Sequence, residues 1–126
     1  MIVCDTNILV EFYKGNAEIS AALMTIGVSN LAVSVITTGE LYYGARDKHE
    51  LRKIQKHLAL LKQLPLDNET SSLFLTLIEQ FALSHKLSIP DALIAATAIQ
   101  NHLSLFTLNT KDFYYLPHLE LFKFPK

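Results

Sequence analysis

The sequence predicts a single α/β domain, in which a central and mostly parallel sheet of about four or five strands is flanked by helices. Short apolar, strand-like runs alternate along the chain with longer segments of helical periodicity, and this order is typical of a parallel sheet covered by helices. The 126 residues suffice for one domain with a real core. A hydrophobic content of 50% predicts a well-filled interior and excludes disorder.

The N-terminal part of the chain predicts a strand, two helices and a second strand. Residues 2–4 (IVC) read as a short buried strand, followed by a short helix over residues 6–13. A second helix is expected over residues 17–26, before a glycine. Residues 31–36 (LAVSVI), which are rich in β-branched Val and Ile, predict the next strand.

The middle of the chain predicts two more helices. The first covers residues 38–46 and the second residues 48–63. In the second, apolar residues recur at spacings of three and four, namely at Leu51, Ile54, Leu58 and Leu61. The dipeptide Pro65-Leu66 leaves room only for a very short edge strand.

The C-terminal part predicts a long helix that begins after a cap at Asp67 or Asn68. Residues 92–99 are apolar nearly all round, so we expect a central, buried helix there. Residues 105–107 and 119–122 supply the last two predicted strands.

Charge and cysteine content narrow the class of function. The formal net charge is −1, so any contact with nucleic acid must use a local basic face. Cys4 is the one cysteine, which excludes an intramolecular disulfide and a multi-thiolate zinc site and fits a reducing compartment. The start MIVC lacks a basic leader, and no apolar run approaches membrane-spanning length. We therefore expect a cytoplasmic protein.

Four acidic residues each stand shortly after an apolar run, where a strand is expected to give way to a helix or loop: Asp5, Glu40, Asp91 and Asp112. In an open α/β sheet the carboxyl ends of the strands form one rim, where ligands bind. Each pair of carboxylates about 4 Å apart costs on the order of 4 kcal/mol at an effective dielectric near 20. A hard cation such as Mg²⁺ or Mn²⁺ relieves that repulsion. The pattern predicts metal-dependent chemistry on a phosphate substrate.

Each acid also has an explanation as a helix cap or turn residue. Asp5 can cap the helix that follows it. The segments Thr37 to Glu40 and Ser88 to Asp91 both match a capping box. Asp112 can be a turn residue. Capping alone predicts a mixture of Ser, Thr, Asn and Asp at such places, and a carboxylate at all four favours a shared role.

Four segments, in order along the chain, resemble the motifs of the PIN-domain ribonucleases, and most closely those of VapC-type toxins of bacterial toxin–antitoxin pairs. These segments are residues 2–9 (IVCDTNIL), 37–45 (TTGELYYGA), 90–98 (PDALIAATA) and 107–113 (TLNTKDF). The opening D-T-N alone is a weak signal, whereas the four motifs in sequence are a strong one. The resemblance implies one PIN domain over residues 1–126.

The resemblance also implies an activity and a set of site residues. It implies a metal-dependent endoribonuclease that hydrolyses RNA phosphodiesters and inhibits translation as a toxin. Asp5, Glu40 and Asp91 match the three core acids, and either Asp112 or Asn109 matches the more variable fourth position. We expect Asp5, Asp91 and Asp112 to hold one Mg²⁺ or Mn²⁺ while Glu40 orients or deprotonates water. The supporting polar residues are Thr6, Asn7, Thr107 and Asn109.

The same resemblance implies partners. We expect a cognate small antitoxin that covers the acidic groove, and a homodimer or a hetero-oligomer with the antitoxin. Apolar residues on short helices can form these interfaces or can be core: Ile8, Leu9, Phe12, Tyr13, Leu41 and Tyr42.

A basic stretch in the middle of the chain can follow an RNA backbone or can be an ordinary solvated helix face. Its candidate RNA-binding residues are Arg46, Lys48, Arg52, Lys53 and Lys56.

Two alternatives lie within the same family: a PIN nuclease that processes RNA without being a toxin, and an inactive PIN fold that only binds, would carry the same motifs. Other classes of protein fit less well. A haloacid-dehalogenase-like phosphatase needs a second Asp where this chain has Asn7. A receiver-like signalling module needs paired acids after the first strand and a phosphorylated Asp, for which Asp67 is a poor fit.

Overall fold

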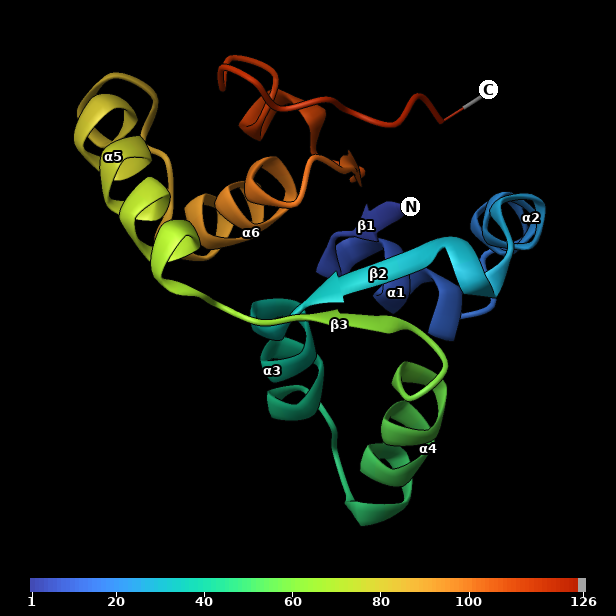
Figure 1. The fold of residues 1–126 in the computed structure, drawn as a ribbon. Coiled ribbons are helices and arrows are strands. Elements are labelled where there is room, and N and C mark those ends of the chain that lie inside the picture. The colour runs from blue at the N-terminus through green and yellow to red at the C-terminus, as the bar shows by residue number, and fades with distance from the viewer. Residues whose placement is uncertain (125–126) are drawn as a thin grey trace.

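A four-stranded, wholly parallel sheet separates two helical layers in the computed structural model of the chain, which describes residues 1–124 (Figure 1). This agrees with the α/β class expected from the sequence. The elements follow in the order β1 (Ile2–Cys4), α1 (Thr6–Tyr13), α2 (Ala17–Ile26), η1 (Val28–Asn30), β2 (Leu31–Ser34), α3 (Val35–Tyr43), α4 (Lys48–Leu58), β3 (Lys62–Leu64), α5 (Asn68–His85), α6 (Ile89–Gln100), β4 (Ser104–Phe106) and η2 (Thr110–Asp112), where η marks a 3₁₀ helix.

The strand order is β3-β2-β1-β4, so β1 lies in the middle of the sheet. Val3 pairs with Ala32 of β2 on one side and with Leu105 of β4 on the other. Because all pairs are parallel, the carboxyl ends of the four strands share one edge. The residue that leaves β1 at this edge is Asp5.

Side chains of the strands alternate between two cores, as the period of two in a strand requires. Val3 and Leu105 are fully buried on the face covered by α5 and α6, where Leu77 and Ala95 meet them. The residues that follow them, Cys4 and Phe106, belong to the second core, which α1, α2 and α4 cover with Ile8, Ile19 and Ile54. Burial on both faces explains why the central strands β1 and β2 are mostly apolar, whereas the edge strand β3 exposes Lys62 and Gln63.

The α6 helix is the central buried helix predicted from the sequence. Its small residues allow close contact with neighbouring elements and are fully buried at Ala92, Ala95, Ala96 and Ala98. It packs along α5 and also contacts α3, β2 and β4. Its position fixes the first turn of α6, and therefore Asp91, relative to the sheet.

Two predicted boundaries in the middle of the chain are wrong. The strand predicted to reach residue 36 ends at Ser34, whose side chain caps α3 by accepting a hydrogen bond from the Thr37 backbone N–H at 3.1 Å. The helix predicted over residues 38–46 therefore starts at Val35. The β-branched residues 35 and 36 favoured a strand locally, but the cap stops the strand two residues earlier.

The predicted helix over residues 48–63 is also too long. The α4 helix ends at Leu58, and residues 62–64 form the edge strand β3 in place of the predicted Pro65-Leu66 strand. The last predicted strand, residues 119–122, makes only an isolated bridge between Leu121 and Leu105. Among the described helices, none is both long enough and apolar enough to cross a bilayer.

Candidate active site

Asp5 lies where β1 turns into α1, and its carboxylate is held from two sides. Oδ1 accepts a 2.8 Å hydrogen bond from the Thr6 backbone N–H, which caps α1, and Oδ2 accepts a 2.7 Å hydrogen bond from the Thr107 hydroxyl. Only 5% of Asp5 is exposed. Burial raises the pKa of Asp5, the two hydrogen bonds oppose the shift, and the charges of Glu40 and Asp112 add to it.

The loop after β4 is attached to the start of α1 through Asn7 and Thr107. The Asn7 amide oxygen accepts a 3.2 Å hydrogen bond from the Leu108 backbone N–H, and its Nδ2 lies 3.4 Å from Thr107 Oγ1. The Thr107 hydroxyl also accepts a hydrogen bond from the Asn109 backbone N–H at 3.1 Å. Thr107 thus orients Asp5 and shapes the loop that carries Asn109.

Glu40 reaches the same place from α3. Its Oε1 accepts a 2.6 Å hydrogen bond from the Thr6 hydroxyl, which also lies 3.1 Å from Thr37 Oγ1. The predicted capping box from Thr37 to Glu40 is wrong, since Ser34 is the cap and Glu40 lies further along the helix. The Glu40 carboxylate therefore points across to α1 rather than back to the start of its own helix.

Asp91 lies in the first turn of α6, and its backbone N–H donates a 3.2 Å hydrogen bond to the capping Ser88 hydroxyl. It follows a helix, not a strand, because α5 precedes it; the expected strand-to-helix junction is wrong for this acid. Burial and the nearby Asp5 raise the pKa of Asp91 to about 6, with smaller contributions from the charges of Asp112 and Glu40. The four acids thus act on one another electrostatically.

These side chains border one open pocket of about 430 Å³ at the carboxyl edge of the sheet. The predicted site residues among its lining are Asp5, Thr6, Asn7, Glu40, Asp91 and Asn109. Thr107 supports Asp5 from behind. Asp112, in η2, is not part of the lining, but its charge raises the pKa of both Asp5 and Asp91.

The donor set of the pocket is carboxylate, amide and hydroxyl oxygen, which suits a hard divalent cation. Within residues 1–124, no three His, Cys, Asp or Glu side chains are grouped closely enough to hold a metal by themselves. Mg²⁺ does not need such a cage, because it usually keeps several waters and takes one or two protein carboxylates together with substrate phosphate. The unbalanced negative charge on Asp5 and Asp91 therefore fits a hydrated Mg²⁺.

A larger groove of about 810 Å³, bordered by α1, α3 and α4, opens beside the acidic pocket and shares Thr6, Val10 and Glu40 with it. We call it the basic groove, because its lining includes Lys14, Arg46 and Lys53, which outnumber the two carboxylates of the lining, Glu40 and Glu50. The predicted RNA-binding residues thus divide into two groups. Arg46 and Lys53 line this groove, whereas Lys48, Arg52 and Lys56 do not.

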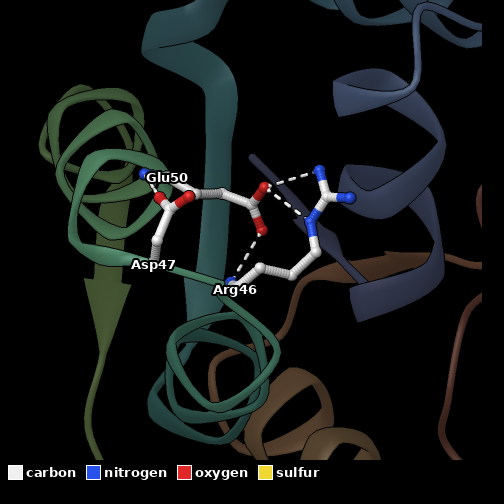
Figure 2. A network of polar contacts seen from close by, with 3 residues as sticks. All are labelled: Arg46, Asp47 and Glu50. Atoms are coloured by element: carbon white, nitrogen blue, oxygen red, sulfur yellow. Dashed lines mark hydrogen bonds and ion pairs between the residues drawn. The ribbon is translucent and has the colours of Figure 1, made fainter.

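Arg46 and Glu50 both line the basic groove, and Glu50 of α4 holds Arg46, which lies in the connection between α3 and α4 (Figure 2). Arg46 Nε and Nη2 donate to Glu50 Oε2 at 3.1 and 3.0 Å, and the Arg46 backbone N–H donates to Oε1 at 3.1 Å. Asp47, between them, caps α4 by accepting a 2.8 Å hydrogen bond from the Glu50 backbone N–H. The pair raises the pKa of Arg46 and lowers that of Glu50.

The structure also sorts residues that the sequence left open or missed. Ile8, Leu9 and Leu41 are core and cannot form an interface, since at most 5% of each is exposed. Glu11 lines the acidic pocket but was not predicted. Its spacing of four from Asn7 places both on one face of α1, and that spacing was the available signal.

The protein is therefore an α/β protein whose parallel sheet has an acidic, oxygen-lined pocket at its carboxyl edge. Comparison with known families gives the family: the PIN domain model matches residues 2–119. The chain is 28% identical over 132 residues to Ribonuclease VapC of Rickettsia bellii, covering 98% of this chain and 96% of that protein. It is 30% identical over 115 residues to Ribonuclease VapC10 of Mycobacterium tuberculosis, covering 90% and 86%. The chain belongs to the PIN domain family.

Solved structures agree with this assignment. A toxin–antitoxin complex from Klebsiella pneumoniae has a chain that superposes with a TM-score of 0.81 at 31% identity, covering 94% of this chain and 95% of that chain. FitAcB from Neisseria gonorrhoeae gives 0.81 at 26% identity, covering 98% and 97%. DNA-bound VapBC from Salmonella typhimurium gives 0.85 at 21% identity over 98% of both chains, a likeness of fold alone. The family resemblance and the fold class predicted from the sequence are confirmed.

Proposed function

We propose that the protein is a divalent-metal-dependent endoribonuclease, and that it is the toxin of a VapBC-type pair that inhibits translation. The observation that supports this most is the pocket bordered by Asp5, Glu40 and Asp91, in a chain that belongs to the PIN domain family. The relatives named Ribonuclease VapC cover nearly the whole chain, which supports the same chemistry for the whole domain.

Asp5 and Asp91, with Asp112 nearby, would hold Mg²⁺ or Mn²⁺. When bound, the ion polarises a phosphoryl oxygen and lowers the pKa of water. Thr107 and the Thr6 backbone N–H hold the Asp5 carboxylate in one orientation, so that it needs no rearrangement during the reaction. Asn109 adds an amide to the pocket lining on the side of the loop after β4.

Glu40 orients the attacking water and accepts its proton. The Thr6 hydroxyl fixes Glu40 Oε1, which leaves Oε2 available to water in the pocket. In-line attack on an RNA phosphodiester then breaks the bond to the 3′-oxygen, which leaves with a proton as a 3′-hydroxyl, and the other product carries a 5′-phosphate.

The basic groove takes the RNA backbone. Lys14, Arg46 and Lys53 line it, and it meets the acidic pocket at Glu40, so a strand that follows the groove delivers a phosphate to the acids. Positive charge elsewhere on α4 supports the approach of RNA at longer range, from Lys48, Arg52 and Lys56.

The partners we propose are a small cognate antitoxin and a second copy of the chain. Chains of similar fold and at least 25% identity occur in toxin–antitoxin structures from Klebsiella pneumoniae and nontypeable Haemophilus influenzae. The antitoxin would cover the acidic pocket and exclude RNA. Because the proposed substrate is RNA that takes part in translation, we place the protein in the cytoplasm.

The test is incubation of the purified chain with total RNA, with Mg²⁺ or with EDTA, followed by mapping of the cleaved ends. We expect cleavage only with Mg²⁺, and its loss in Asp5→Asn and Asp91→Asn, which retain size and hydrogen bonding. Asp47→Asn is the matched control, since Asp47 only caps α4 and Asn caps equally well. Wild-type rates in the Asp5 and Asp91 variants, or cleavage in EDTA, would overturn the proposal.

A further inference from the structure

Four aromatic side chains gather where the end of α5 meets the segment after η2. We call Phe81, His85, Tyr114 and Tyr115 the aromatic cluster. The rings of His85 and Tyr115 are stacked, with centroids 3.9 Å apart and planes at 15°. Tyr115 also meets Phe81 at 5.3 Å and the edge of Tyr114 at 5.7 Å and 90°. The cluster brings together two segments about 30 residues apart in sequence.

The cluster follows Asp112 along the chain, although none of its four residues lines the acidic pocket. Tyr115 comes three residues after Asp112, and a tight turn joins them, since the backbone N–H groups of Phe113 and Tyr114 both donate to the Thr110 carbonyl at 3.0 and 2.9 Å. Burial raises the pKa of Tyr115, and the charges of Asp112 and Asp91 raise it further. The Tyr115 phenol is therefore within electrostatic reach of two of the acids.

Core packing does not account for the whole cluster. Phe113 and Leu116 anchor this segment, with 1% and 4% exposed. Tyr114, between them, is 70% exposed, and His85 is also exposed. Stacking of His85 on Tyr115 produces a layered pair of flat rings that reaches solvent. A flat ligand can extend such a stack, and every nucleic-acid base offers a π-face.

We propose that the aromatic cluster is a stacking site for an unpaired base of the RNA whose backbone is cut at the acidic pocket. This inference rests on the proposed ribonuclease function and adds a preference to it. A base can stack on the cluster only when it is free of a duplex, so the site selects single-stranded RNA or a loop. Lys86, directly after His85, and Lys111, directly before Asp112, are exposed and can contact flanking phosphates.

A neutral, flat group suits this place better than a second phosphate. The charges of Asp91 and Asp112 act on Tyr115 and repel an anion that approaches the cluster, whereas a base carries no charge to repel. The RNA backbone on the other side of the scissile bond can bind in the basic groove, because that groove meets the acidic pocket at Glu40. The base and the backbone are thus bound by different surfaces.

The experiment measures binding of a labelled, unstructured 20-nucleotide RNA to the full chain carrying Asp5→Asn, so that the RNA stays intact. Tyr115→Leu keeps apolar bulk against Phe81 but removes the flat ring, and Tyr115→Phe keeps the ring. His85→Leu removes the other half of the stack. We expect Tyr115→Leu and His85→Leu to weaken binding roughly five- to hundredfold, the range for the loss of one stacked base, and Tyr115→Phe to bind as the parent does. Thermal melting checks that every variant is folded.

A ribose-phosphate 20-mer without bases separates stacking from charge. We expect the parent and Tyr115→Leu to bind this base-free strand equally. The inference is overturned if the parent and Tyr115→Leu bind normal RNA with equal affinity. It is also overturned if Tyr115→Leu loses as much affinity for the base-free strand as for normal RNA. Failure of the ribonuclease proposal is a separate result, because it appears as absence of Mg²⁺-dependent cleavage by the chain without substitutions.

Discussion

At the scale of single residues, Thr107 is the side chain on which the orientation of Asp5 depends. Thr107→Val keeps the shape but removes the 2.7 Å hydrogen bond to a nearly buried carboxylate oxygen. Hydrogen bonds to charged groups contribute about 1.5–3 kcal/mol. We expect the free energy of unfolding to fall by about that amount at pH 7, measured by urea denaturation, and Mg²⁺ affinity to fall with it.

Two substitutions control this measurement. Thr107→Ser keeps the hydroxyl and should retain most of the stability and the metal affinity. Thr110→Val makes the same chemical change at an exposed residue of η2 and should change the free energy of unfolding by less than about 0.5 kcal/mol. A Thr107→Val variant as stable as Thr110→Val would show that the hydroxyl does not support Asp5.

Asp91 predicts a dependence of stability on pH. Its folded-state pKa of about 6 lies above the ordinary value of 3.8, so between these values the folded chain keeps a proton that the unfolded chain has lost. Stability therefore falls as the pH rises from about 4 to about 6 and stays lower above that. In EDTA at pH 7.5, Asp91→Asn should be more stable than wild type, by about 1 kcal/mol after allowance for solvent screening.

Melting curves at pH 4, 6 and 7.5 check this. The advantage of Asp91→Asn should become small near pH 4, where the carboxyl of the folded wild type is protonated and that of the unfolded chain is about half protonated. Mg²⁺ should favour the wild type, because the charged carboxylate is the ligand, and its apparent affinity should weaken as the pH falls below about 6. If Asp91→Asn melts at a lower temperature than the wild type at pH 7.5 in EDTA, then burial and the charge of Asp5 do not destabilise the ionised Asp91 carboxylate.

At the scale of elements, local signals predicted most helices and misplaced those whose ends depend on neighbours. Asp5, Asp67 and Ser88 are caps, as the sequence indicated. Ser34 was not recognised as one, because residues 31–36 carry an unbroken strand-like pattern. The choice between strand and helix at Val35 is made by tertiary contacts: Thr37 is fully buried, and its hydroxyl meets Thr6.

The position of Ser34 gives a prediction for α3. Ser34 is fully buried, and Ser34→Ala removes the hydrogen bond to the Thr37 backbone N–H at the start of the helix that carries Glu40. We expect a loss of about 1–2 kcal/mol in the free energy of unfolding, together with slower RNA cleavage. Ser29→Ala, at an exposed position in η1, is the control. Equal stability of the two variants would show that Ser34 does not cap α3.

At the scale of the whole molecule, a net charge of −1 is unevenly distributed: acidic residues border one pocket, and three basic side chains line the groove that meets this pocket at Glu40. The sequence predicted acids on one rim, because parallel strands end together. It did not separate the basic residues that line the groove from those that do not. The spacing of the basic residues within α4 is visible in the sequence, but packing decides which face of α4 lies toward α1.

That separation yields a prediction about salt. Each phosphate contact with single-stranded RNA contributes about −0.7 to the slope of log K against log salt concentration. Lys53 lines the groove, whereas Lys56, one turn further along α4, is exposed outside it. In the Asp5→Asn background, Lys53→Ala should weaken binding and make the slope shallower by about 0.7, and Lys56→Ala should leave the slope nearly unchanged. Arg46 is a poorer choice for this test, because its loss also releases Glu50. Identical slopes for the Lys53 and Lys56 variants would mean that RNA does not follow the groove between α1 and α4.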